Sequence, residues 1–238
     1  MAGMATYMGT MGLSARSYRN IIGANDRVNV GVIGFSDRFR SSLLPSFVNL
    51  HKELNFDMVA VSDIWKKRRE DGQAYLKKQL GHDITACVNN EALYDLKNID
   101  AVIISTADFQ HALHTVEAVK AGKDTYTEKP LAETMEDARA VLKAVKDSGK
   151  IVQIGSQRRS GATYKAAYDF IQEGKFGPIV MVELIWNVNQ PGRWRRPSLV
   201  PQLREEDTDW KRFLLNRPFE KFDPRKYLEF RLFWPYSS

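Results

Sequence analysis

The feature that most constrains the fold is an alternation of short apolar runs with longer helical stretches between residues 28 and 155. Residues 28–34 and 56–62 are compact apolar runs typical of buried strands, and residues 101–104 are wholly apolar, as expected of a central parallel strand. In the stretch 133–148 the apolar residues recur at helical spacing. A chain in which strands alternate with helices in this way favours an α/β fold with a doubly wound parallel sheet.

The pattern changes beyond about residue 158. We expect a helix over 162–173, a strand over 179–188, an ordered loop rich in Pro and Arg over 189–204, and a short capped helix over 207–214. One strand is not stable without sheet partners. Residues 159–238 are therefore predicted to be an incomplete second α/β unit.

Composition excludes several classes of protein. The net charge of +6 suggests anionic ligands at most, because the basic residues are scattered apart from runs at 66–69, 158–159 and 193–196, with no basic–aromatic stripe of the nucleic-acid-binding kind. A single cysteine, Cys87, rules out an internal disulfide framework. Of the four histidines only His111 and His114 have the spacing of metal ligands, so we expect no metal site.

The N-terminal residues 1–26 have two interpretations. The first fifteen are apolar, rich in Met and Gly, and uncharged, but they are too short and too broken by glycine to span a membrane. They also lack the basic start of a secretory leader. They are expected to be either a disordered tail, with the protein in the cytoplasm, or the remnant of an export leader, with the protein in the periplasm.

The turn after the first predicted strand matches a dinucleotide fingerprint only in part. That fingerprint has three glycines, which let the backbone approach a pyrophosphate at the N-terminus of a helix. The chain has Gly34, Ser36 and Phe39 at these positions. Ser36 can offer its N–H and hydroxyl to phosphate, whereas Phe39 threatens close helix–strand packing and Asp37 adds unfavourable negative charge. Alone, this turn is a weak signal.

Asp63 follows the second predicted strand. A carboxylate at this strand end can accept hydrogen bonds from both ribose hydroxyls of an adenosine, which favours NAD over NADP. The alternative is that Asp63 only caps the following helix. Lys66 and Lys67 soften the discrimination against a 2′-phosphate.

Polar residues also follow the later strands, at the sheet edge where open α/β folds bind ligands. Ser105 and Thr106 end one strand, and Glu128-Lys129-Pro130 ends the next, where Pro130 cannot donate to a sheet ladder. His111 and His114 lie one turn apart on the helix between them. They are either site residues or ordinary, partly exposed histidines.

Taken together, these features resemble the Gfo/Idh/MocA oxidoreductases, the family of glucose–fructose oxidoreductase and inositol dehydrogenase. The resemblance spans about residues 27–238. The segment before it is similar to the end of a twin-arginine leader, although the arginine pair is absent. The residues that carry the resemblance are the strand 30–34, Asp63, Ser105-Thr106-Ala107-Asp108 with His111, 121–124, Glu128-Lys129-Pro130, and Gly155-Ser156-Gln157-Arg158-Arg159.

The resemblance implies a Rossmann NAD(P)-binding domain at 27–158 and a partial substrate and oligomerisation domain at 159–238. It implies NAD, with NADP as the alternative, as cofactor, a sugar or polyol as substrate, and a homo-oligomer. Lys129 would be catalytic, near the reacting hydroxyl. The cofactor would contact Gly34, Phe35, Ser36, Asp37, Arg38, Asp63, Ser105, Thr106, His111, Glu128, Lys129 and Gln157. The substrate would contact Gln157, Arg158, Trp186, Arg193 and Trp194.

The chain departs from the family at two points. Two of the three glycines are missing, and the family's principal acid/base histidine belongs to a helix that would begin shortly after residue 238. We therefore expect a sugar or polyol dehydrogenase whose turnover is impaired in this chain. Two alternatives remain: a glycoside hydrolase that uses bound NAD catalytically, and a nucleotide-binding remnant without catalysis.

Overall fold

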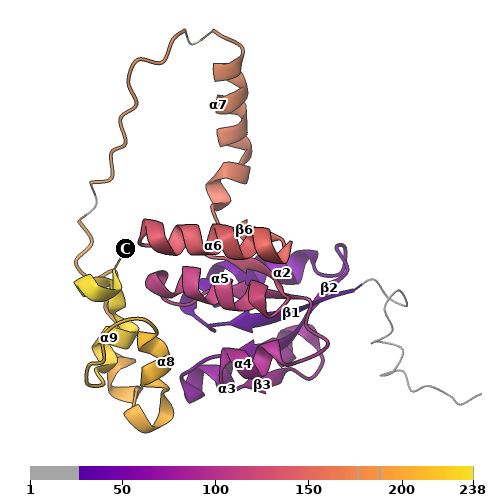
Figure 1. The fold of residues 1–238 in the computed structure, drawn as a ribbon, viewed down its shortest axis with the longest axis vertical. Coiled ribbons are helices and arrows are strands. Elements are labelled where there is room, and N and C mark those ends of the chain that lie inside the picture. The colour runs from indigo at the N-terminus through magenta and orange to yellow at the C-terminus, as the bar shows by residue number, and fades with distance from the viewer. Residues whose placement is uncertain (1–26, 176, 188, 238) are drawn as a thin grey trace, which may run out of the picture.

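The computed structural model describes residues 27–175, 177–187 and 189–237. Its centre is a six-stranded sheet in the order β3-β2-β1-β4-β5-β6, and every neighbouring pair is parallel (Figure 1). The strands are β1 (Val28–Ile33), β2 (Phe56–Ser62), β3 (Thr85–Cys87), β4 (Ala101–Ile104), β5 (Asp124–Thr127) and β6 (Val152–Ile154). The predicted doubly wound sheet is confirmed, and the order reverses between β1 and β4, where such folds bind ligands.

Helices cover both faces of this sheet because alternate strand residues point in opposite directions. Val30 and Val32 of β1 belong to a core with the first helices, whereas Ile33 belongs to a second core on the opposite face. The helices of the sheet domain are η1 (Phe39–Leu43), α2 (Leu44–Leu50), α3 (Lys66–Leu80), α4 (Asn90–Tyr94), η2 (Asp108–Gln110), α5 (His111–Lys120) and α6 (Met135–Ser148).

The first helical stretch, residues 39–50, is not a single regular α-helix. Residues 39–43 form a π-helical turn, and the α-helix α2 starts only at Leu44, with Pro45 in its first turn. The first turn of a helix leaves its N–H groups unpaired, so proline is tolerated there and not deeper inside.

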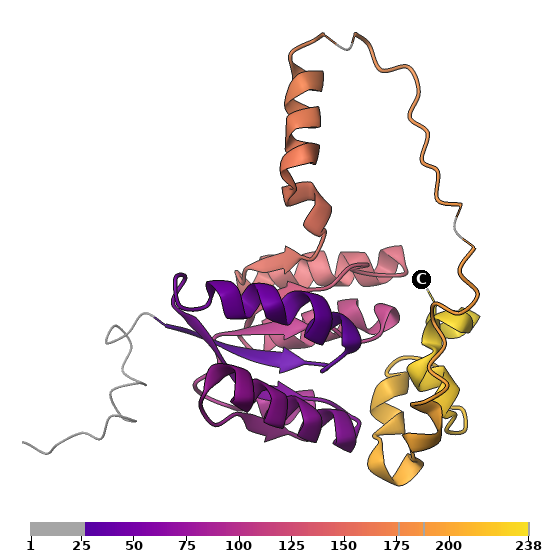
Figure 2. The ribbon, with the colours of Figure 1, turned by 180° about the vertical axis from the view of Figure 1, so that it is seen from behind.

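After β6 the chain leaves the sheet. A short turn, η3 (Gln157–Ser160), leads to α7 (Ala162–Gln172), which stands out from the sheet domain with no buried residue (Figures 1 and 2). Residues 177–187 are extended and belong to no sheet, so the strand predicted over 179–188 is wrong for its described part, 179–187, and Val188 lies outside it. An extended segment becomes a strand only by pairing, and no described segment pairs with this one.

Residues 199–237, here called the C-terminal segment, return to the sheet domain (Figure 2). They contain α8 (Trp210–Leu214) and α9 (Pro224–Leu228), with 3-10 turns η4 (Val200–Gln202), η5 (Glu205–Asp207), η6 (Phe230–Leu232) and η7 (Trp234–Tyr236). The predicted capped helix is α8, which is shorter than expected, and its cap is Asp209, whose carboxylate accepts from the N–H of Arg212 at 2.9 Å.

The C-terminal segment docks through a third apolar core at the carboxyl edge of the sheet. Phe109, at the start of the α5 region, packs with Phe213 and Tyr236 at ring distances of 5.3–5.5 Å. The Gln110 side chain donates to the Phe213 carbonyl at 2.7 Å. The segment therefore forms one wall of the space above the strand ends. No helix in the described part of the chain is long and apolar enough to cross a membrane.

Candidate functional site

A cavity of about 780 Å³ lies between the strand ends and the C-terminal segment, within the range that small-molecule sites occupy. It brings together residues that are distant in the sequence and that belong to the ends of four strands. Thirteen of the predicted site residues line it: Ser36, Asp37, Arg38, Ser105, Thr106, His111, Glu128, Lys129, Gln157, Arg158, Trp186, Arg193 and Trp194. A smaller cavity of about 90 Å³, lined by Gly34 and Asp63, adjoins it.

Gly34 makes the turn that brings the backbone to the cavity. Its φ is +85°, and a Cβ there would lie 2.8 Å from the Ser105 carbonyl oxygen and 2.9 Å from Thr106 Cγ2. Both the conformation and the space exclude a side chain. This one glycine of the fingerprint is therefore required by the geometry.

The two phenylalanines of the turn are core residues. Phe39 is fully buried, and the Phe35 ring packs against it in a tilted arrangement, with 5.7 Å between the ring centres. Phe35 lines neither cavity, so its side chain is not placed for the predicted cofactor contact. Phe39 does not disturb the packing as expected, because it belongs to the first apolar core, with Val30 and Phe47. Gly72 of α3 makes room for Phe35: a Cβ at Gly72 would lie 2.8 Å from the Phe35 ring.

Ser36, Asp37 and Arg38 line the cavity next to this turn. The Ser36 hydroxyl lies 2.8 Å from that of Ser105 and accepts from the N–H of Phe39 at 3.1 Å, so it caps the helical turn. The charge expected to be unfavourable, on Asp37, is balanced by Arg196 at 3.2 Å. Arg38 pairs with Glu128 at 3.1 Å and with the Gln157 side chain.

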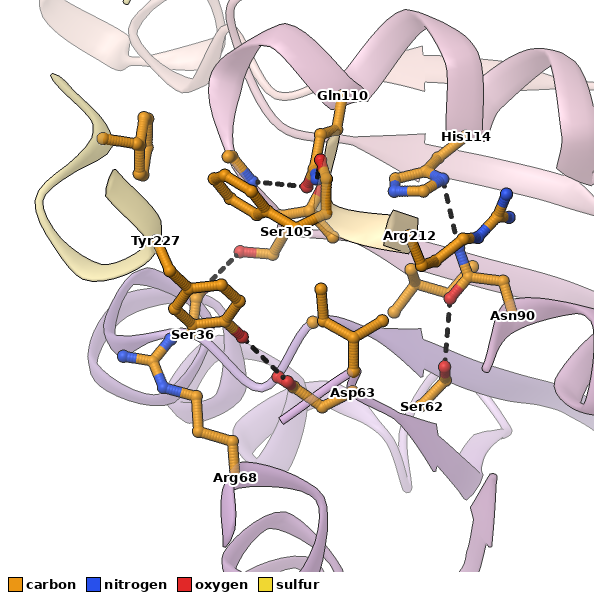
Figure 3. A pocket seen from close by; sticks show the side chains of 17 residues that line it. Ser36, Ser62, Asp63, Arg68, Asn90, Ser105, Gln110, His114, Arg212 and Tyr227 are labelled. Atoms are coloured by element: carbon orange, nitrogen blue, oxygen red, sulfur yellow. Dashed lines mark hydrogen bonds between the residues drawn. The ribbon is translucent and has the colours of Figure 1, made fainter. Parts of the chain in front are cut away.

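Asp63 is buried and already holds three hydrogen bonds. One carboxylate oxygen accepts from the N–H of Phe35 at 2.9 Å, and the other accepts from the N–H of Trp65 at 2.9 Å. This second oxygen also accepts from the Tyr227 hydroxyl at 3.2 Å (Figure 3). Burial raises the pKa of Asp63, and Arg68 and these backbone donors oppose the shift. The N-cap residue of α3 is Trp65, so Asp63 is not the cap of this helix. Asp63 instead shapes the turn before α3 by accepting the N–H of Trp65.

The histidines of α5 are both buried, so the interpretation of partly exposed histidines is wrong. His111 lines the large cavity, and its Nδ1 donates to the Pro130 carbonyl at 2.7 Å. Burial lowers the pKa of His111, which favours the neutral ring. His114 lines only the small cavity, where its Nδ1 lies 3.1 Å from the Asn90 amide and 3.1 Å from Glu117 (Figure 3).

Glu128 and Lys129 lie at the end of β5 with different environments. Glu128 is buried and held by Arg38, and its N–H donates to the Ile104 carbonyl at 3.0 Å. Lys129 is exposed to the cavity and has no carboxylate partner among the described residues. The ammonium of Lys129 is therefore available to a ligand.

On the far wall, the predicted substrate residues Arg158, Trp186, Arg193 and Trp194 line the cavity. The Arg193 and Arg231 guanidinium carbons lie 4.5 and 4.4 Å from the centre of the Trp194 ring, which orders this wall by cation–π contact. Trp186 is largely exposed because the extended segment that carries it has no sheet partner.

Sequence reasoning missed several lining residues: Arg68, Asp108, Arg196, Tyr227, Phe230 and Arg231. Arg68 and Arg196 lie in the basic runs at 66–69 and 193–196, but the sequence did not indicate which side chains of these runs face the cavity. Nothing in the sequence indicated that residues of the C-terminal segment line the cavity, because their position depends on how that segment docks.

The site fits a dinucleotide by three observations. The Gly34 turn lets the backbone approach closely, the Ser36 and Ser105 hydroxyls face each other beside it, and Thr106 Oγ1 and His111 Nε2 are buried without a hydrogen-bond partner among the described residues. Buried polar atoms in native proteins normally have a hydrogen-bond partner, so these two atoms beside the cavity are open to a ligand. Gly34 and Ser36 would hold the pyrophosphate, Asp63 the adenosine ribose, and Thr106 and His111 the nicotinamide side. No group of three potential metal ligands gathers anywhere in the described ranges.

The fold and the glycine turn define the class: a Rossmann-type nucleotide-binding domain. A family model described as "Oxidoreductase family, NAD-binding Rossmann fold" matches residues 28–156, more than half of the chain. The chain belongs to this family, Gfo/Idh/MocA, which binds NAD.

Named relatives agree. Inositol 2-dehydrogenase of Salmonella typhimurium is 32% identical over 198 residues, 81% of this chain and 54% of the relative. The 1,5-anhydro-D-fructose reductase of Ensifer adhaerens is 32% identical over 157 residues, 62% of this chain and 46% of the relative. This chain thus spans about half the length of the curated relatives it matches.

Solved structures show the same fold. The myo-inositol 2-dehydrogenase of Lactobacillus plantarum is 25% identical with a TM-score of 0.54, covering 65% of this chain and 43% of its own. The WlbA dehydrogenase of Bordetella pertussis, in complex with NADH and UDP-GlcNAcA, is 21% identical with a TM-score of 0.57, covering 63% and 42%.

Proposed function

We propose that this chain is the cofactor-binding part of an NAD-dependent dehydrogenase that moves a hydride between a CH–OH group of a sugar or polyol and the nicotinamide. The observation that carries the proposal is the single cavity of about 780 Å³ that joins the glycine-turn residues at one end to His111 and Lys129 at the other. The similarity to inositol and anhydrofructose enzymes supports the substrate class.

The chemistry divides between cofactor and protein. The nicotinamide accepts or returns a hydride, with both electrons. The protein must hold the substrate hydroxyl and manage its proton, and Lys129 is placed for this: an ammonium beside the hydroxyl oxygen stabilises the negative charge that develops as the proton leaves. Burial of Glu128 against Arg38 fixes the strand end that carries Lys129.

The lining also supports the division of the chain at about residue 158. Residues before it supply the cofactor side, and Trp186, Arg193 and Trp194 from the second part supply a wall opposite Lys129. We propose that residues 159–238 belong to the substrate side of the enzyme and that the extended segment 177–187 contributes to its assembly.

A titration with NADH, followed by quenching of tryptophan fluorescence, tests the proposal. We expect saturable binding by the intact chain, binding weakened about tenfold by Asp63→Asn, which changes an acceptor that the ribose needs, and near-normal binding for Lys129→Met. Lys143→Met, an exposed lysine of α6 outside the cavity, is the matched control. Absence of NADH binding by a folded chain overturns the proposal.

A second measurement addresses the chemistry. With NAD and a panel of polyols, any turnover of the intact chain should fall in Lys129→Met through kcat, with the NADH dissociation constant unchanged. A loss that appears only as weaker NADH binding would contradict the role given to Lys129.

A further inference from the structure

The positive charge of this chain is concentrated in one place. Eight of its 35 Lys and Arg residues line the large cavity, but only three of its 29 Asp and Glu residues do. The remaining 27 basic and 26 acidic residues nearly cancel. Five of the six net positive charges of the whole chain therefore belong to the wall of the cavity.

The three carboxylates of this wall are already paired with arginines. Glu128 pairs with Arg38 at 3.1 Å, and Asp108 accepts from Arg231 Nε at 2.8 Å. Asp37 lies 3.2 Å from Arg196 and 3.8 Å from Arg68. None of the acidic groups is left to attract a further cation.

Four cations of the wall have no carboxylate partner within the described ranges. They are Lys129, Arg158, Arg159 and Arg193. The Arg158 side chain donates to the Tyr164 hydroxyl at 3.4 Å, and Arg193 lies over the Trp194 ring. Like charges gathered without counter-charges repel each other, and an anionic ligand removes that repulsion.

The cofactor accounts for only part of this charge. Its pyrophosphate carries two negative charges and would be held at the Gly34 turn, after β1, with Asp63, after β2, holding the adenosine ribose. Arg158 and Arg159 follow β6, at the opposite end of the strand order, beyond β5 and Lys129. Arg158 and Arg159 therefore lie on the side of the cavity left for the substrate, and Arg193 adds a third guanidinium group from the wall that carries Trp194.

The chemistry of this wall suits a sugar that carries an anion. Guanidinium groups bind carboxylate and phosphate oxygens with two parallel hydrogen bonds. Trp194 adds a flat apolar surface, held between Arg193 and Arg231, against which the C–H face of a sugar ring packs. A neutral polyol would leave three guanidinium groups without a counter-charge.

We propose that the substrate of this site is an anionic sugar or polyol, bearing a carboxylate or a phosphate that Arg158, Arg159 and Arg193 bind. This inference rests on the proposed function, because it assigns the cofactor to the opposite end of the cavity. It names the substrate class of that same site.

Calorimetric titration of the NADH-saturated chain tests it with four probes: D-glucose, D-glucuronate, D-glucose 6-phosphate and inorganic phosphate. We expect one or both anionic sugars to bind at least about tenfold more tightly than glucose, since each charge-assisted hydrogen bond contributes that much. Glucuronate and glucose 6-phosphate distinguish carboxylate from phosphate. Added salt should weaken the preference, because these arginines are exposed to solvent.

Variants locate the effect. Arg193→Gln and Arg158→Gln should each reduce binding of the preferred anionic sugar about tenfold without changing NADH affinity. Lys146→Gln, an exposed cation on α6 outside the cavity, is the matched control and should change nothing. A lower NADH affinity in the arginine variants would mean that these cations serve the cofactor, and would overturn the inference.

The remaining outcomes separate the two proposals. If NADH binds but glucose binds as well as the charged sugars, or no sugar binds, the inference on substrate class is wrong and the cofactor function stands. If inorganic phosphate binds as tightly as glucose 6-phosphate, the wall binds ions without recognising a sugar, which also overturns it. If NADH itself does not bind, the proposed function fails first.

Discussion

Two apolar stretches of this chain, β4 and the extended segment 177–187, share a composition and end in opposite environments. In β4, Val102 and Ile104 are 1% and 0% exposed, between β1 and β5. In the extended segment, Val180 and Leu184 are 93% and 92% exposed. The comparison teaches that β-branched apolar residues favour an extended backbone, but that an extended segment becomes part of a sheet and its core only where partner strands pair with it.

The C-terminal segment stands between these extremes, because it has no strand pairing beyond the isolated bridge between Trp65 and Thr208, yet it is buried. Aromatic packing replaces the sheet ladder. Trp210 and Phe213 stack at 5.0 Å, and Phe213 contacts Phe109 at 5.4 Å. The same chain thus shows burial by pairing, burial by aromatic docking, and no burial.

The largest difference in stability is expected between truncation of an aromatic residue in the docked core and truncation of an apolar residue in segment 177–187. Phe213→Ala removes a buried ring at the centre of the docked core and should lower the free energy of unfolding by about 3–5 kcal/mol. Leu184→Ala, in the exposed segment, should change it by no more than about 0.5 kcal/mol. Chemical denaturation measures both. Equal effects would show that segment 177–187 is buried in solution and would break the comparison.

The turn at Gly34 gives the next largest effect. Gly34→Ala should destabilise the chain by about 1–3 kcal/mol, because it combines a left-handed φ with a clash against the Ser105 carbonyl, and it should weaken NADH binding. Gly81→Ala is the control: its φ of +77° is similar, but nothing lies within 4 Å of a Cβ there. Both variants carry the backbone strain, so the difference between their free energies of unfolding measures the cost of the clash with the Ser105 carbonyl.

These regions also mark what the sequence could predict. The strands ending at Ile104 and Thr127 were predictable because residues that favour strands, and the polar residues that follow each strand, are local signals. Phe35 was wrongly predicted to contact the cofactor, because Gly72, which makes room for its ring in the core, lies on another helix. Tyr227 was missed because its contact with Asp63, 164 positions away, depends on the aromatic docking of the whole C-terminal segment. Long-range packing leaves no periodic trace in the sequence.

A smaller effect on stability is expected at the contact between Tyr227 and Asp63. Tyr227→Phe removes one hydrogen bond to Asp63 and should cost about 1 kcal/mol of stability. It should also strengthen NADH binding several-fold, because the adenosine ribose competes with the Tyr227 hydroxyl for the same carboxylate oxygen. Tyr75→Phe, on α3, is the control for removal of a hydroxyl. Weaker NADH binding in Tyr227→Phe would show instead that the hydroxyl contacts the cofactor.

The smallest effect on stability is expected for the ion pair between Glu117 of α5 and Arg212 of α8, which links the sheet domain to the C-terminal segment. Glu117 of α5 accepts from Arg212 of α8 at 2.7 Å and lies 3.1 Å from His114. Burial opposes the shift, but these hydrogen bonds and charges lower the pKa of Glu117 below its ordinary value of 4.5. A carboxyl group with a lowered pKa stabilises the fold fully above that ordinary value and loses its contribution as the pH falls through the lowered one.

The stability gained from Glu117 should therefore decrease as the pH falls below 4.5 and be lost once the pH has passed through the lowered pKa, and for this partly exposed group we expect only about 0.5 kcal/mol. Unfolding of the intact chain and of Glu117→Gln, measured from neutral to acidic pH, should converge in acid. Glu91→Gln removes the other carboxylate on Arg212, 3.0 Å away and more exposed, and serves as control. If Glu117→Gln and the intact chain differ by the same amount at every pH, packing rather than charge links α5 to α8, and aromatic docking alone holds the C-terminal segment against the sheet.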